Sequence, residues 1–178
     1  MARIAGLDYE EATNRMTAAL RGFNMELNAL SAERVNDVYS KLAAISASNV
    51  DEISTAMDKT ASLANSVGMS FETTSAFLAQ GIETTRESAD SIGTALKTVL
   101  ARFTEVKKAA SDIVEVDGEM VDVNKVDTAL ASVGISLKKT TGEFRNMEDV
   151  FLELSSKWDS LDTMSKRYIA TMAAGSRQ

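Results

Sequence analysis

Five carboxylates between residues 112 and 122 form the densest set of side chains that could do chemistry: Asp112, Glu115, Asp117, Glu119 and Asp122. Clustered carboxylates can bind a calcium ion or work as a general acid and base. An EF-hand loop places oxygen ligands at fixed alternate positions ahead of a glycine and a final glutamate, and this run lacks that register. Alternating acidic and apolar residues are typical of a half-exposed strand pair, which is the interpretation we favour.

Glu143, beside Phe144 and Arg145, could be the acid of a sugar-cleaving enzyme, but no partner carboxylate can be identified for it. The chain contains no histidine and no cysteine, which excludes Ser–His–Asp triads, cysteine nucleophiles, disulfides and zinc sites with the usual ligands. The nine glycines form neither a P-loop nor a dinucleotide-binding fingerprint. We therefore expect no enzymatic activity, no catalytic residue, no metal and no cofactor.

Basic residues are outnumbered, because 19 Lys and Arg stand against 26 Asp and Glu and give a net charge of −7. Affinity for nucleic acid rests on basic side chains that neutralise phosphates, and anionic membranes also attract basic segments. Lys107-Lys108 falls in the last turn of a predicted helix, where cations oppose the negative end of the helix dipole. We therefore expect no specific nucleic-acid partner.

Helices must position most of these residues. Proline is absent from all 178 residues, which suits a mostly helical chain because a helix tolerates proline only near its first turn. Apolar residues recur at steps of three and four over 50–67, 92–106 and 150–158, so each set lies on one helix face that must be buried. Gly68 and Gly134 stand where a helix would end in a left-handed residue. We predict helices over 7–23, 31–46, 49–67, 70–86, 88–110, 124–133, 146–160 and 163–174.

The starts of these helices carry polar residues suited to N-capping. They are Asp8, Asn49, Ser70, Ser88, Asn146 and Asp162. Glu11 and Glu52 add the spacing of a capping box to the first two.

Two segments break the helical pattern and predict β-hairpins. Residues 113–123 place Asp117-Gly118 between β-favouring neighbours, which is a strong hairpin signal. Residues 135–145 repeat the pattern more loosely around a Thr-Gly pair. We expect a mainly α fold with a small β-hairpin element (α+β), built as a compact multi-helix domain of amphipathic helices.

The sequence changes character near residue 112, where long helices give way to strands and shorter helices. This change predicts a helical subdomain over 1–111. A mixed subdomain with both hairpins and the C-terminal helices would follow over 112–178.

Four segments, in this order, resemble the core region of phage tail tape measure proteins. They are Ser91 to Thr98, Ala129 to Arg145, Val150 to Leu161 and Ile169 to Gln178. The resemblance covers about residues 45–178 well and residues 1–44 loosely, and the order of the four motifs carries it. It marks twelve positions with a structural or interaction role: Gly93, Thr94, Leu96, Lys97, Gly134, Gly142, Phe144, Arg145, Trp158, Gly175, Arg177 and Gln178.

The resemblance implies a structural protein of a tailed phage or prophage. Members of that family lie in several copies along the lumen of the tail tube, set tail length during assembly and leave when DNA is ejected. The implied partners are further copies of the chain and the tail tube, tail tip and assembly-chaperone proteins. The implied places are the virion tail and, during assembly, the host cytoplasm, with membrane contact only after ejection.

A measuring rod should be one long helix that rises about 1.5 Å per residue. The sequence instead restarts a helix at short intervals and inserts hairpins, which is typical of a compact domain. We therefore expect a folded module of a tape measure protein and, because such proteins are far longer than this chain, a fragment. The alternatives are a helical adaptor or secreted effector that binds a partner helix, and a fragment of a wall-degrading enzyme.

Overall fold

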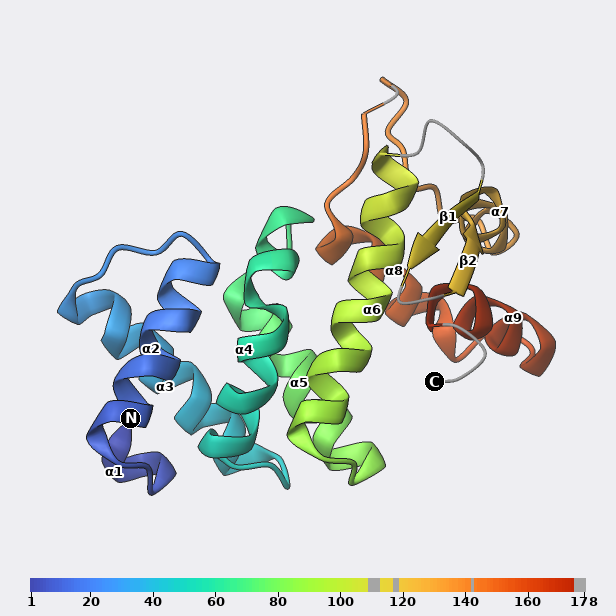
Figure 1. Ribbon diagram of the computed structural model, residues 1–178. Helices are drawn as coiled ribbons and strands as arrows, with labels where there is room; N and C mark the ends of the chain where they lie inside the picture. Colours follow the sequence, from blue (N-terminus) through green and yellow to red (C-terminus); the bar gives the residue numbers. More distant parts are fainter. Residues whose placement is uncertain (109–112, 117–118, 142, 175–178) are drawn as a thin grey trace. The chain divides into compact units, whose positions relative to one another are not determined.

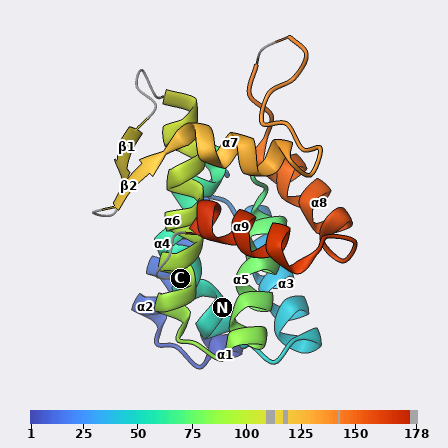
Figure 2. The same ribbon diagram turned by 90° about the vertical axis from the view of Figure 1, so that its right-hand side faces the viewer.

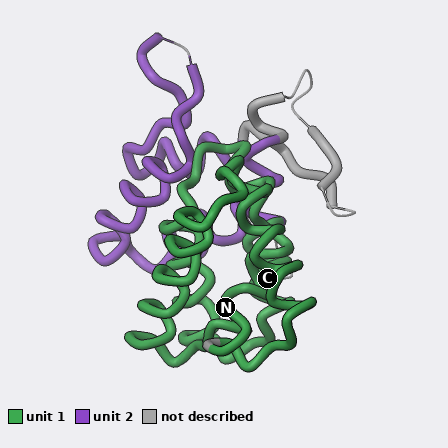
Figure 3. The backbone as a smooth tube through the Cα atoms, turned by 90° about the vertical axis from the view of Figure 1, so that its left-hand side faces the viewer, with its two compact units in different colours: residues 1–97 green, residues 98–178 purple. Residues whose placement is uncertain are grey.

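The computed structural model of the chain describes residues 1–108, 113–116, 119–141 and 143–174. The chain divides into two compact units, coloured separately in Figure 3: unit 1, Met1–Lys97, and unit 2, Thr98–Gln178. The subdomain boundary predicted at residues 111 and 112 falls outside the described residues and stays a prediction.

Unit 1 is helical throughout (Figure 1). Its elements are α1 (Ala2–Ala5), α2 (Tyr9–Gly22), α3 (Ala29–Ile45), α4 (Val50–Ser66), α5 (Phe71–Thr85) and the first part of α6 (Ala89–Lys108). Helix α4 is central, because it packs against α2, α3 and α5 and its Ala56 also lies against Gly93 on α6. The core of unit 1 therefore forms around α4, whose buried face includes Ile53 and Met57.

Unit 2 holds the end of α6, the strands β1 (Ile113–Val116) and β2 (Glu119–Asp122), and the helices α7 (Val123–Ala131), α8 (Met147–Trp158) and α9 (Thr163–Ala174). Helix α9 packs against α7, as Figure 2 shows. The rings of Phe103 and Phe151 meet edge to face with their centroids 5.5 Å apart. Other buried apolar residues of this unit are Leu100, Val126, Ala129, Leu130, Ile135, Leu137, Met147, Val150 and Ile169.

The predicted α+β class is wrong. Helices form unit 1 entirely and supply most of the described part of unit 2, so a compact helical fold is what the chain adopts. Strands β1 and β2 have four residues each and pair antiparallel only with each other, with Ile113 opposite Asp122. A two-stranded ribbon of this size provides no sheet face on which a domain core could form.

The first predicted hairpin is present as β1 and β2, whereas the second, at residues 135–145, forms no strands and is only a bridged loop. The described part of this segment is a loop in which one isolated bridge joins Lys138 and Phe144. Backbone bonds flank the bridge, from the Arg145 amide to the Leu137 carbonyl at 2.9 Å and from the Lys139 amide to the Glu143 carbonyl at 2.7 Å, and the chain then enters α8 at Met147. The intervening residues are polar and mostly exposed, so no apolar cross-strand pairs support a ladder.

The predicted helices are confirmed. Side-chain caps define where several of them begin. Asn49 accepts a bond from the Glu52 amide while the Glu52 carboxylate accepts one from the Asn49 amide, both at 2.9 Å. The side chains of Asp8, Ser70, Ser88 and Asp162 also accept bonds from the first turns of their helices. Asn146 takes the N-cap position of α8, as predicted, but its side chain makes no capping bond.

Unit 1 contains an aromatic cluster and two unusually close helix contacts. The Phe71 ring lies 5.3 Å from the Tyr39 ring and 5.6 Å from the Phe23 ring, measured between centroids. Gly22 on α2 lies so close to α4 that a Cβ atom there would be 2.5 Å from the Cβ of Ala61. Glycine therefore sets how closely α2 approaches α4.

Candidate functional site

The positions marked by the resemblance fall into two clusters and a remainder. Gly93, Thr94, Leu96 and Lys97 lie on α6 within unit 1, and the second cluster lies in unit 2. The members of the second cluster are Gly134, Phe144, Arg145 and Trp158. The remainder lies outside the described residues: Gly142, Gly175, Arg177 and Gln178.

The cluster on α6 is divided between two faces of the helix. Gly93 is buried and Leu96 packs against the core of unit 1, whereas Thr94 and Lys97 are exposed. A Cβ atom at Gly93 would lie 2.5 Å from the carbonyl oxygen of Ala56 and 2.9 Å from its Cα. Gly93 therefore lets the backbones of α4 and α6 touch, which is a packing role.

The unit 2 cluster is built around the segment 134–145, which we call the pinned loop. Gly134 ends the α7 region with φ of +73°, in the left-handed region that favours glycine. The amide of Arg145 then donates to the carbonyl of Leu137 at 2.9 Å, which closes the base of the loop. Figure 2 shows the loop in orange, extending from the ends of α7 and α8.

An ionic network fastens the pinned loop to α8. Arg145 Nη1 lies 2.7 Å from one oxygen of Glu153, and Lys157 Nζ lies 3.0 Å from the other. The same two cations donate to loop carbonyls: Arg145 to that of Ser136 at 3.1 Å, and Lys157 to that of Gly134 at 3.0 Å. The carboxylate of Glu153 thus orients the two side chains that hold the loop.

The network perturbs Glu153 itself. Hydrogen bonds from Lys157 and then Arg145 lower the pKa of Glu153 below its usual value of 4.5. A carboxyl whose pKa is lowered by folding stabilises the fold above its unfolded pKa, and this contribution is lost as the pH falls through the folded pKa.

We expect Glu153→Gln to lower the melting temperature of unit 2 at pH 7, because Arg145 and Lys157 lose their shared carboxylate. The difference from wild type should shrink as the pH falls below 4.5 and should be lost once the pH lies below the lowered pKa of folded Glu153, where both proteins carry a neutral side chain. Fluorescence of Trp158, the one tryptophan in the sequence, reports the unfolding of this unit. Asp159→Asn is the matched control, because Asp159 is exposed and has no ion pair in the described structure, so it should melt like wild type. An equal loss for both variants at pH 7 would contradict this role.

The remaining positions of the unit 2 cluster, Phe144 and Trp158, are only partly buried. Trp158 is partly exposed at the end of α8. Lys138 places its Nζ 5.1 Å from the centre of the Phe144 ring. Glu143 is exposed, and its nearest cation is Lys139 at 4.0 Å. Glu143 is therefore a solvated surface carboxylate.

Sequence reasoning missed a polar cluster in unit 1, centred on Arg15 of α2. Its guanidinium bonds Glu11 on the same helix and reaches the carboxylate of Asp51 on α4 at 2.5 Å. It also donates to Ser54 Oγ at 3.2 Å and to Thr55 Oγ1. The spacing of Glu11 and Arg15 is readable in the sequence as an i,i+4 pair, but the α4 partners are distant in the sequence.

An open depression of ≈ 450 Å³ lies beside Arg15. It is lined by Asp8, Glu10, Glu11, Asn14, Arg15 and Asp58. The surrounding protein keeps water from part of the Asp58 carboxylate and so raises the pKa of Asp58, although Arg15 and Lys59 oppose this shift. The depression is acidic, with four carboxylates and one guanidinium in its lining.

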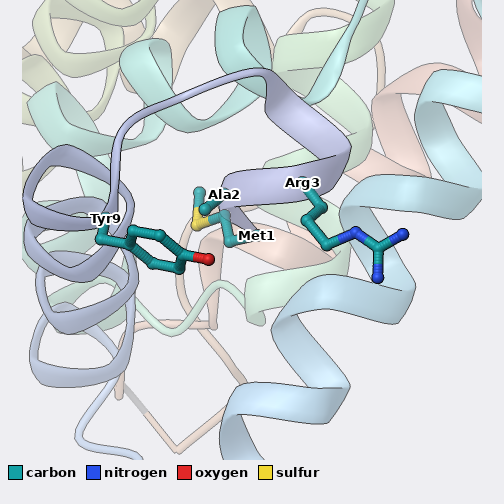
Figure 4. A pocket seen from close by; sticks show the side chains of 4 residues that line it. All are labelled: Met1, Ala2, Arg3 and Tyr9. Atoms are coloured by element: carbon teal, nitrogen blue, oxygen red, sulfur yellow. The ribbon is translucent and has the colours of Figure 1, made fainter.

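A second open depression, of ≈ 570 Å³, is shown in Figure 4 and is lined by Met1, Ala2, Arg3 and Tyr9. The Tyr9 ring extends toward Met1 and Ala2, whereas Arg3 points away. Because its polar groups do not converge, this depression offers no chemistry.

No three acidic side chains in the described part of the chain gather as metal ligands. Within the described ranges, no helix combines the length and apolar character needed to cross a membrane. Of the carboxylate run, Asp112 and Asp117 lie outside the described residues, and Glu115 lies opposite Met120 in the strand pair.

Comparison with known proteins gives one match over nearly the whole chain. A family model described as phage-related minor tail protein matches residues 1–175. No solved structure matches the chain. The family match spans both units, and therefore both the α6 cluster and the pinned loop.

Proposed function

Because the chain belongs to the phage-related minor tail protein family and is thus a structural component of a phage tail, we propose that it is a folded module of a tail tape measure protein. The whole tape measure protein sets tail length, and this module takes part in tail assembly and in DNA ejection. It works in the lumen of the tail tube, after assembly in the host cytoplasm.

The packing of unit 1 is the observation that carries the module proposal. Helix α4 has 17 residues and would span only about 25 Å, and α2, α3 and α5 fold back against it to bury a shared core. In a rod that sets tail length, each residue must extend the helix along one axis. Helices that turn back on one another contribute little length for each residue.

The proposed partners are further copies of the chain and the tube, tip and assembly-chaperone proteins of the tail. Support comes from large apolar side chains at the surface of unit 1, such as Leu30, which is 76% exposed, and Ile45, which is 73% exposed. A partner that covered these side chains would remove their apolar area from water. The role involves no catalytic step.

We expect an in-frame deletion of these codons to leave tail length unchanged or to prevent tail formation. The measurement is tail length by electron microscopy of the phage. A rod of 178 residues would instead shorten the tail by about 270 Å at about 1.5 Å per residue. Tails shortened by that amount would overturn the module proposal.

A point variant provides the control for the deletion. Gly93→Ala removes no residue but should disturb the contact of α4 with α6. If the folded module is required for assembly, this variant should reproduce the defect of the deletion, most clearly at raised temperature. A rod would still give tails of full length with this variant.

A further inference from the structure

Helix α2 brings fewer large buried apolar side chains to unit 1 than α4 and α5 do. Its fully buried residues are Ala12, Ala19 and Leu20, and Met16 is partly buried against the core, so the apolar packing of α2 lies mostly in its second half. By contrast, the core of unit 1 takes Ile53 and Met57 from α4 and Phe71, Leu78 and Ile82 from α5. Apolar burial scales with area, so α2 gains less from packing than its neighbours do.

One arginine supplies most of the polar attachment. Arg15 donates to the carbonyl of Asp51 at 2.8 Å, to its carboxylate, and to the hydroxyls of Ser54 and Thr55, all in the first turns of α4. The Arg15 side chain is only 14% exposed, so these bonds are partly shielded from water. A single side chain therefore joins α2 to the start of α4.

In the described part of the chain, the folded state also leaves a buried polar group without a hydrogen bond, which costs free energy. Tyr39 on α3 is fully buried, and its hydroxyl has no hydrogen-bond partner among the described residues. Burial raises the pKa of Tyr39, the charge of Asp58 adds to this shift and Arg15 opposes it, and Tyr39 shares the buried core with Ala19 and Leu20 of α2. Departure of α2 would bring water to this group and relieve the cost.

The connection between α2 and α3 has the features of a hinge. Asn24 adopts φ of 52°, a left-handed conformation that few residues other than glycine favour. Phe23 packs its ring on Phe71 of α5, so the end of α2 is anchored beside the turning point. The turn can thus stay in place while the rest of α2 moves.

We propose that α2 is a releasable latch. When Arg15 loses its bonds to the first turns of α4, α1 and α2 detach together while α3, α4, α5 and the start of α6 stay folded. The opening is a sub-global event with its own equilibrium, distinct from the unfolding of unit 1. It does not depend on the proposed role in the tail.

Hydrogen exchange of the full chain, followed by mass spectrometry, tests the latch. In wild type, the amides of α2 should be protected at least about tenfold less than those of α4 and α5. Arg15→Gln should raise the exchange of α2 by about tenfold, because it removes charge-assisted bonds. Arg34→Gln removes the exposed pair of Arg34 with Glu72 between α3 and α5, and should leave the exchange of α2 unchanged.

A second variant separates the latch from global unfolding. Ile82→Val makes a mild cavity in α5, which remains folded in the open state. It should speed the exchange of α4 and α5 several-fold and leave that of α2 unchanged. The proposal is overturned if α2 exchanges as slowly as α4 and α5 in wild type, or if Ile82→Val speeds all three helices equally. This comparison decides the question even if Arg15→Gln fails to fold.

Discussion

We expect Gly93→Ala to lower the free energy of unfolding of unit 1 by about 2 kcal/mol. The added methyl group would meet the backbone of Ala56, with 2.5 Å to its carbonyl oxygen and 2.9 Å to its Cα. Backbone atoms of a central helix cannot rotate aside, so α6 must move away from α4. Alanine favours the helical state over glycine by about 1 kcal/mol, which offsets only part of the loss.

Urea unfolding followed by circular dichroism measures this change, and Trp158 fluorescence follows unit 2 separately. Gly81→Ala is the matched control, because it makes the same substitution inside α5 of the same unit. Its new Cβ would lie 2.9 Å from the Cγ2 of Ile92, which is a side-chain atom that can shift. We expect this control to stay within about 1 kcal/mol of wild type, since the gain in helix propensity opposes a smaller clash. Equal stability of wild type and Gly93→Ala would contradict the close approach of α4 and α6.

The helices could be predicted from the sequence because their signals are local. The capping box of Asn49 with Glu52, and the Ser70 cap, involve residues three apart, and the apolar stripes repeat within one helix. The predicted α+β class was wrong because the turn signals at Asp117-Gly118 and near residue 142 were interpreted as evidence for a β-sheet. Turn residues indicate where a chain reverses, but they do not show whether the flanking strands are long enough to build a sheet.

The candidate site could be predicted only in part. Resemblance marked Gly93 and Arg145, but their roles depend on atoms that the sequence does not place beside them. For Gly93 that atom is the carbonyl oxygen of Ala56, and for Arg145 it is the carboxylate of Glu153. The Arg15 cluster was missed for the same reason, because tertiary folding alone brings Asp51 to it.

The second large change in stability is expected at the buried hydroxyl of Tyr39, which has no hydrogen-bond partner among the described residues. We expect Tyr39→Phe to raise the free energy of unfolding of unit 1 by about 1–2 kcal/mol. The hydroxyl is fully buried and has no partner among the described residues, so folding removes its bonds to water without replacement. Phenylalanine keeps the ring, and with it the contact with Phe71 at 5.3 Å.

The control for this variant is Tyr9→Phe, in the same unit. Tyr9 is 83% exposed, so its hydroxyl stays hydrated in both states and its loss should change stability by less than about 0.5 kcal/mol. Urea unfolding of the three proteins gives the comparison directly. A loss of stability in Tyr39→Phe would mean that the hydroxyl bonds an internal water in the folded protein, since a buried group that is truly unpaired cannot stabilise the fold. In that case the cost that favours release of α2 would also be absent, and Tyr39→Phe would speed the exchange of the α2 amides instead of slowing it.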